Sequence, residues 1–156
     1  MLPQVISRRS ALRLGLAGAA LPLAGGMPGR ARAETLPPVV VWKDPNCGCC
    51  SGWVGHLRKA GFGVTVRDTA DMDVIKRARN VPDALQSCHT AVVSGYVIEG
   101  HVPADDIKRL IAGRPSAKGL AVPGMPQSAP GMDQPGEPYD VVMFGTPAGD
   151  QIYAQH

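Results

Sequence analysis

The fold of this chain is decided by residues 39–60, which read VVVWKDPNCGCCSGWVGHLRKA. Residues 39–42 form a short β-branched run, which predicts a buried strand. The turn-forming residues 44–50 follow as a loop, and residues 51–60 place apolar side chains at helical spacing, with Gly61 as the stop. This order of strand, cysteine-bearing loop and helix predicts an α/β domain.

Further elements of the same kinds follow along the chain. They are a strand at 63–67, a helix at 71–80, a short turn or helix at 82–87, a hairpin of strands 90–93 and 96–99, and a helix at 103–113. Strands and helices alternate around one sheet, and a cysteine motif lies between the first strand and the first helix. The expected fold class is therefore α/β and thioredoxin-like, with a single sheet and flanking helices.

The rest of the chain predicts a long loop and a closing hairpin. Residues 115–138 hold six Pro and four Gly, a composition typical of a loop. Long loops in compact domains are usually functional or disordered, and we expect this one to lie over the candidate metal site that the cysteines define. Residues 140–144 and 151–153 then predict a C-terminal hairpin.

Residues 1–33 have the features of an export signal. Five of the 16 basic residues of the chain and none of its 13 acidic residues lie there. The basic start at Arg8-Arg9 is followed by a short apolar run and an Ala31-Arg32-Ala33 end, which is the pattern of a cleaved leader. The paired arginines resemble a twin-arginine signal. Ala11 stands where that signal prefers Phe, so the general secretion route stays open.

The charge of the chain changes sign when this segment is removed. The whole sequence carries a formal net charge of +3. Cleavage after Ala33 leaves 11 basic and 13 acidic residues, a net charge of −2. The product, residues 34–156, therefore has no basic run for binding nucleic acid. It also has no apolar segment long enough to span a bilayer, so we expect an exported, periplasmic domain with no stable membrane insertion.

Four cysteines lie in this product: Cys47, Cys49, Cys50 and Cys88. A cysteine at a helix N-terminus has a lowered pKa, because the helix dipole and the free backbone N–H groups favour its anion. Clustered thiolates repel one another unless a cation neutralises them, and soft thiolates select Cu(I), Zn(II) or iron–sulfur clusters. Cys88-His89 precedes a predicted strand, at the place that faces the first cysteine loop in a thioredoxin-like fold. The two motifs therefore predict one metal site.

The sulfur-bearing residues also have simpler interpretations. Cys47 and Cys50 have the C-x-x-C spacing of a redox pair or of a local disulfide. Cys88 taken alone would be an inert buried thiol. Met125 and Met132 are auxiliary candidates, because thioether sulfur suits Cu(I), and packing of the loop onto the domain explains them equally well.

The remaining histidines and the tryptophans are interpreted from their positions. His101 fits a surface or capping residue as well as it fits a ligand. His56 lies off the apolar face of its helix, which predicts an exposed side chain, and the last residue, His156, is expected to be frayed. Trp42 and Trp53 are expected in the core.

Four stretches carry a more specific signature. They are residues 41–50 (VWKDPNCGCC), 87–91 (SCHTA), 95–103 (GYVIEGHVP) and 119–126 (GLAVPGMP). With them, the chain resembles a bacterial periplasmic family with a C-x-C-C motif, once described only as a domain of unknown function, which includes the CopG-like copper-resistance proteins. The resemblance implies a thioredoxin-like fold, a part in Cu(I)/Cu(II) interconversion and other periplasmic copper-handling proteins as partners. The copper ligands that it implies are Cys47, Cys49, Cys50 and Cys88, followed by His89 and His101.

Two departures from ordinary thioredoxins favour a metal over disulfide exchange. Cys49 stands where thioredoxins carry a proline, and His89 stands at the place of their cis-proline. The leading hypothesis is therefore a periplasmic protein that binds copper, preferably Cu(I), in copper resistance or handling; whether it is also an enzyme stays open. One alternative is a thiol–disulfide oxidoreductase that uses Cys47 and Cys50. The other is a zinc or iron–sulfur protein. Zinc sites usually draw their ligands from two separated pairs of cysteines or histidines, and this sequence has only one such cysteine pair.

Overall fold

The computed structural model describes residues 35–132 and 134–156. Its elements are, in chain order, β1 (Val39–Lys43), α1 (Gly48–Lys59), β2 (Val64–Asp68), α2 (Met72–Ala78), the 3₁₀ helix η1 (Asp83–Leu85), β3 (His89–Val93), β4 (Tyr96–Glu99), α3 (Ala104–Gly113), β5 (Gly119–Ala121), β6 (Asp140–Phe144) and β7 (Gln151–Gln155). The expected export signal at residues 1–33 lies outside the described residues. Within them, no helix has the length and apolar character needed to cross a membrane.

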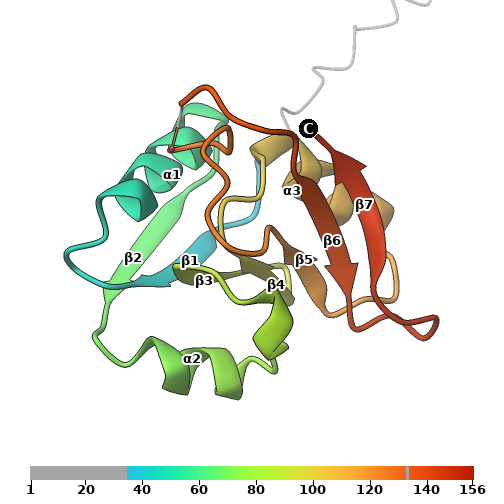
Figure 1. The fold of residues 1–156 in the computed structure, drawn as a ribbon. Coiled ribbons are helices and arrows are strands. Elements are labelled where there is room, and N and C mark those ends of the chain that lie inside the picture. The colour runs from blue at the N-terminus through green and yellow to red at the C-terminus, as the bar shows by residue number, and fades with distance from the viewer. Residues whose placement is uncertain (1–34, 133) are drawn as a thin grey trace, which may run out of the picture. The chain divides into compact units, whose positions relative to one another are not determined.

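The strands of the described residues form one mixed sheet with the order β2-β1-β3-β4-β5-β6-β7 (Figure 1). β1 runs parallel to β2 and antiparallel to β3, and β3 forms a hairpin with β4. β4 runs parallel to β5, and antiparallel pairing continues to β6 and β7. The prediction of an α/β domain with a single sheet is confirmed, while the finer thioredoxin-like assignment stays a prediction.

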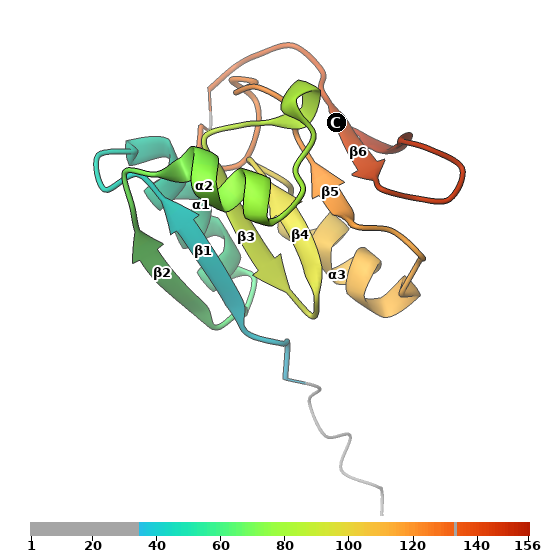
Figure 2. The same cartoon turned by 90° about the horizontal axis from the view of Figure 1, so that it is seen from below.

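Helices cover both faces of the sheet. Figure 2 shows α2 in front of the sheet, and α1 and α3 behind it. On the α1 and α3 side, Trp53, Leu57, Ile107 and Leu110 belong to the main core with inward-facing strand residues. A smaller cluster occupies the α2 side; its buried members are Val81, Leu85, Val97, Ala121 and Phe144. Because side chains alternate along a strand, β3 and β4 supply residues to both faces.

β5 lies inside the stretch whose composition predicts a continuous loop, so that prediction is wrong at residues 119–121. Leu120 is fully buried in the main core. A Cβ at Gly119 would overlap the carbonyl oxygen of Val97 on β4. The strand therefore needs a glycine where the two backbones meet, and glycine in a short strand gives no β-forming signal.

Two of three ring-bearing side chains interpreted from the sequence differ from their predictions. Trp42 is only half-buried, and the guanidinium groups of Arg67 and Arg79 lie 5.7 and 4.8 Å from its ring centroid. His56 is half-buried rather than exposed, because its Nε2 accepts the Ala104 backbone N–H at 3.0 Å where α3 begins. Trp53 is fully buried as predicted.

The chain end is held in place rather than frayed. The backbone of His156 exchanges both hydrogen bonds with Tyr139, and the two rings stack with centroids 5.4 Å apart. His156 Nε2 also lies 2.7 Å from Oδ2 of Asp106 on α3. The prediction of a frayed terminus is therefore wrong, because Tyr139, the residue just before β6, pairs with the last residue through its backbone.

Candidate metal centre

Cys47, Cys49 and Cys50 lie at the beginning of α1. This helix starts at Gly48, three residues before the start predicted from apolar spacing. Cys47 is the N-cap residue, with an extended backbone, and Cys49 and Cys50 lie in the first turn. The first turn of a helix leaves backbone N–H groups without intrahelical acceptors. The helix thus presents positive partial charge to the sulfurs, which favours anions there.

Lys43, the last residue of β1, anchors the loop that leads into the cysteines. Its ammonium group donates hydrogen bonds to the carbonyl oxygens of Asp44 at 2.9 Å and Pro45 at 3.4 Å. It also pairs with Asp68 of β2 at 3.2 Å. The Cys47 N–H donates to the Asp44 carbonyl at 3.1 Å. Cys47 therefore enters the helix from a constrained turn.

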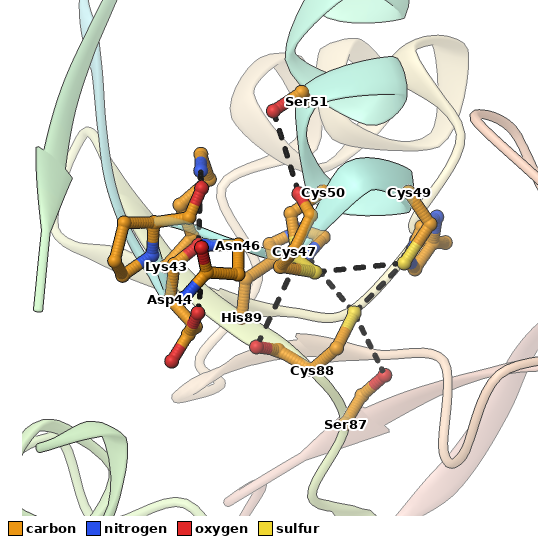
Figure 3. Close-up of a disulfide and its surroundings, with 12 residues drawn as sticks. Lys43, Asp44, Asn46, Cys47, Cys49, Cys50, Ser51, Ser87, Cys88 and His89 are labelled. Atoms are coloured by element: carbon orange, nitrogen blue, oxygen red, sulfur yellow. Dashed lines mark hydrogen bonds between the residues drawn. A yellow bond between two sulfur atoms is a disulfide. The ribbon is translucent and has the colours of Figure 1, made fainter. Parts of the chain in front are cut away.

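The four cysteine sulfurs converge between the α1 N-terminus and the segment before β3 (Figure 3). Their Sγ atoms all lie within 4.8 Å of one another. Cys47 and Cys50 are joined by a disulfide, whereas Cys49 and Cys88 are free thiols. The Sγ atoms of Cys47 and Cys49 are 3.5 Å apart. The structure thus brings together the two cysteine motifs that are 38 residues apart in the chain.

Two imidazoles extend this cluster on the side of Cys88. Its Sγ lies 3.1 Å from Nε2 of His101 and 3.4 Å from Nδ1 of His89. Both histidines are fully buried. His101 Nδ1 lies 2.7 Å from the carbonyl oxygen of Pro130. Because a carbonyl only accepts, Nδ1 carries the proton, and in the neutral ring the lone pair of Nε2 is directed at Cys88 Sγ.

Among the described residues, one buried side-chain nitrogen, Nε2 of His89, has no hydrogen-bond partner. The ring packs against Trp53, with centroids 4.3 Å apart, and edge-on to His101 at 5.1 Å. Burial lowers the pKa of His89 well below its ordinary value, and His101 and Lys76 lower it further. His89 is therefore a neutral imidazole, the form that binds metals.

Burial has the opposite effect on the Cys88 thiol. Removal from water raises the pKa of Cys88 to about 12, and the neighbouring Cys49 adds to the rise. A sulfur in this environment keeps its proton at neutral pH unless a cation replaces it. Cys88 thus differs from the surface-exposed, low-pKa thiolates of redox catalysts.

The Pro/Gly-rich segment, the part of residues 115–138 that follows β5, lies against the site. A Cβ at Gly52 of α1 would lie 2.7 Å from the carbonyl oxygen of Gly131, so this segment and the helix touch through their backbones. On the other side of the cluster, the Ser87 hydroxyl bonds the carbonyl oxygen of Gly124. These contacts hold the segment beside the first turns of α1 and beside Cys88.

The two loop methionines are placed differently. Met125 is 54% exposed and lines a shallow groove with Pro123 and Glu137. Met132 is half-buried and follows Gly131, which touches α1. An auxiliary role for either thioether stays a prediction.

Sequence reasoning missed a polar network directly behind Cys88 and His89. Lys76 of α2 and Glu99 of β4 form a buried ion pair that also engages Ser87 and Thr90. Glu99 ends an otherwise apolar strand, which is a signal in the sequence. Its partner could not be read from the sequence, because nothing there places α2 over that strand.

The relatives of the chain are consistent with this site. Two solved structures, titled "Copper resistance protein copG- Form 1" and "Copper resistance protein copG- Form 2", are each 42% identical in sequence to it. The matches cover 78% of this chain and 98% of each CopG chain, with TM-scores of 0.72 for Form 1 and 0.73 for Form 2.

The chain belongs to the CopG-like copper-resistance family. The family resemblance predicted from the four stretches is thereby confirmed. A family model described as "Protein of unknown function, DUF411" matches residues 85–132. This match contains Cys88, His89 and His101 and the loop as far as Met132. No curated protein matches the chain.

Proposed function

We propose that this CopG-family chain is a periplasmic copper-binding protein of copper resistance or copper handling, with copper as its cargo. The observation that carries the proposal is the convergence of two donor groups that share Cys88. One is formed by the four cysteine sulfurs, and the other by Cys88 with His89 and His101. The copper-resistance titles of two structures at 42% identity support copper as the metal.

The donor set fits Cu(I) best. Thiolate sulfur is the ligand type that selects Cu(I), and imidazole also suits copper. Cys47, Cys49, Cys50 and Cys88 would supply the sulfurs, and His89 and His101 the nitrogens. The Nδ1 atom of His89 supports this assignment, because it lies 3.4 Å from Sγ of Cys88, the cysteine that the two donor groups share. Met125 and Met132 are proposed as auxiliary sulfur ligands.

The Cys47–Cys50 disulfide makes the site dependent on redox state. Two electrons and two protons convert it to two thiols, and only then can both sulfurs act as ligands. In the opposite direction, two thiols and two Cu(II) ions give the disulfide, two Cu(I) ions and two protons. This balanced reaction supports a part in Cu(I)/Cu(II) interconversion.

The proposed location follows from the sequence. Residues 1–33 are proposed to be a twin-arginine-like export signal, cleaved to leave a metal-binding domain at residues 34–156. N-terminal sequencing of the protein from a periplasmic fraction tests this. A protein that starts at Glu34 supports the proposal, and an uncleaved protein in the cytoplasm contradicts it.

The second candidate is a thiol–disulfide oxidoreductase. The observation that favours it is the Cys47–Cys50 disulfide at the start of α1, a position used for redox cysteines. A catalyst of exchange needs one accessible thiolate; Cys50 is fully buried, so the half-buried Cys47 would have to be the attacking thiol. A zinc or iron–sulfur site is a further alternative for the same sulfurs.

Anaerobic titration of the reduced mature protein with Cu(I), in competition with a chromophoric chelator, tests the proposal. Wild type is compared with single Cys→Ser variants at positions 47, 49, 50 and 88. We expect tight binding by wild type and weaker binding by each variant. Wild-type binding weaker than about 1 μM, with no effect of any variant, would contradict copper binding. Insulin reduction by the metal-free protein would instead support the oxidoreductase.

A further inference from the structure

A buried ion pair lies directly behind the Cys88-His89 dipeptide. Lys76 of α2 and Glu99 at the end of β4 contact each other, and their side chains are 5% and 0% exposed. Removing two charges from water is costly, and their attraction offsets the cost only when the remaining hydrogen-bonding positions are also filled. The other partners of the pair therefore indicate its role.

Those partners flank the dipeptide on both sides. Glu99 Oε1 accepts the Ser87 backbone N–H at 2.8 Å, and Glu99 Oε2 accepts the Thr90 hydroxyl at 2.7 Å. Lys76 Nζ donates to Thr90 Oγ1 at 3.3 Å. Ser87 and Thr90 are the residues immediately before and after Cys88-His89. One carboxylate thus fixes the backbone before the dipeptide and the side chain after it.

The segment that leads into Cys88 needs such an anchor, because it has no hydrogen-bonded strand partner. Residues 86–88 lie between η1 and β3 and belong to no helix or strand. A backbone N–H in such a segment must find another acceptor when water is excluded. Glu99 supplies that acceptor for Ser87, and its charge shortens and strengthens the bond.

We propose that Glu99, held in place by Lys76, is a positioning residue that sets Cys88 Sγ and the His89 ring for metal binding. Neither Lys76 nor Glu99 belongs to the donor cluster of sulfurs and imidazoles. The effect on metal affinity rests on the proposed function. The effect on the placement of Cys88 does not, so the two can be tested separately.

The test removes both charges together, because one buried charge left without its partner would strongly destabilise the protein. Lys76→Met with Glu99→Leu deletes the acceptors and keeps similar volumes. Lys76→Met with Glu99→Gln deletes the charge but keeps an amide oxygen for the Ser87 N–H. Asp106→Asn is the matched control, since Asp106 is a buried carboxylate that pairs with Arg109 and His156 outside the donor cluster.

Each protein is measured in two ways after near-UV circular dichroism has shown that it is folded. The first measurement is the Cu(I) dissociation constant of the reduced protein, by chelator competition. The second needs no metal: it is the alkylation rate of Cys88 in a Cys49→Ser background, with Cys47 and Cys50 kept as the disulfide. If wild type binds no Cu(I), the proposed function fails, and the alkylation rate still decides the positioning role.

We expect the Leu double variant to bind Cu(I) about 10- to 100-fold more weakly, the usual loss when a partner of a metal ligand is removed, and to change the Cys88 alkylation rate. The Gln double variant should recover most of the Cu(I) affinity and most of the wild-type alkylation rate. Asp106→Asn should stay within about twofold of wild type in both measurements. Wild-type values for the Leu variant, equal losses in the Leu and Gln variants, or an equal loss in the control would each overturn the proposal.

Thr90→Val decides the question if the Leu double variant does not fold. It removes only the hydroxyl between Lys76 and Glu99 Oε2. We expect weaker Cu(I) binding and an altered Cys88 alkylation rate, both smaller than a complete loss. Unchanged values in both measurements would overturn the proposal.

Discussion

His89 allows metal binding to be separated from stability at a single residue. Its Nε2 is buried and unpartnered, and its ring packs on Trp53. His89→Phe keeps an aromatic ring and removes the unsatisfied nitrogen, so we expect the free energy of unfolding of the metal-free protein to rise by about 1 kcal/mol. Cu(I) affinity should fall, because a ligand is lost. Urea unfolding and chelator competition measure the two effects.

His56 is the control, because its replacement is expected to change stability without changing Cu(I) affinity. Its Nε2 accepts the Ala104 backbone N–H, and it lies outside the donor cluster. His56→Phe should lose about 1 kcal/mol of stability and leave Cu(I) affinity unchanged. A destabilised His89→Phe protein with wild-type affinity would show that His89 has a structural role only.

Cys88 should make the metal-free protein less stable in alkali. Its pKa is raised from 9.0 to about 12 in the folded state, first by burial and then by Cys49. Above pH 9 the unfolded chain therefore releases a proton that the folded chain retains, and stability falls as pH rises toward 12. The slope from this one group is at most about 1.4 kcal/mol per pH unit.

Urea unfolding at several pH values between 8 and 11 (an interval of ~3 pH units that brackets the ordinary thiol pKa) measures this slope. Cys88→Ser has no thiol at this position, so its stability should fall less steeply over the same interval. Parallel curves for wild type and Cys88→Ser would contradict the raised pKa.

At the scale of elements, the contact between α1 and the Pro/Gly-rich segment makes a sharp prediction. A Cβ at Gly52 would lie 2.7 Å from the Gly131 carbonyl oxygen, whereas a Cβ at Gly55 would have no neighbour within 4 Å. Gly52→Ala should therefore destabilise the protein by about 1–3 kcal/mol through forced displacement of the segment. Gly55→Ala, in the same helix, should stabilise it by about 0.5–1 kcal/mol.

The midpoint of urea unfolding compares the two variants. Gly52→Ala should also weaken Cu(I) binding, because the segment it displaces carries Pro130, the partner of His101. A stabilised Gly52→Ala protein would show that the segment yields easily and does not hold the site.

The elements also show what the sequence could reveal. The β-branched run of β1, the turn residues Ser94 and Gly95 between strands 90–93 and 96–99, and the apolar face of α1 identify their elements, because each is a pattern of neighbouring residues. The start of α1 was missed because first-turn residues need no apolar side chain. β5 was missed because its Gly119 is required by contact with β4, which only the tertiary structure creates.

At the scale of the whole molecule, the candidate site also has a part that the sequence predicts and a part that only the tertiary structure reveals. Cys47, Cys49, Cys50 and the Cys88-His89 pair could be predicted, because clustered thiols have few other uses. The place of His101 depends on β4 and on Pro130, and that of Glu99 on α2 covering the second face of the sheet. Those relations arise from packing between distant segments and leave no local pattern.

The oxidation state of the Cys47–Cys50 pair should set the affinity of the whole protein for copper, because it decides how many sulfurs can act as ligands. The disulfide leaves Cys49 and Cys88 as the free thiols, while reduction releases four sulfurs within 4.8 Å of one another. We expect the reduced protein to bind Cu(I) at least about tenfold more tightly than the oxidised one, a difference of ~1.4 kcal/mol. Chelator competition before and after reduction, with removal of the reductant, measures this.

The double variant Cys47→Ser with Cys50→Ser separates ligand loss from other effects of the reductant. It keeps Cys49, Cys88 and both buried histidines but has no disulfide to open, so its affinity should be the same before and after reduction and close to that of oxidised wild type. If oxidised and reduced wild type bind Cu(I) equally, Cys47 and Cys50 are not ligands. The disulfide is then a structural staple of α1, and the copper site consists of Cys49, Cys88 and the two imidazoles alone.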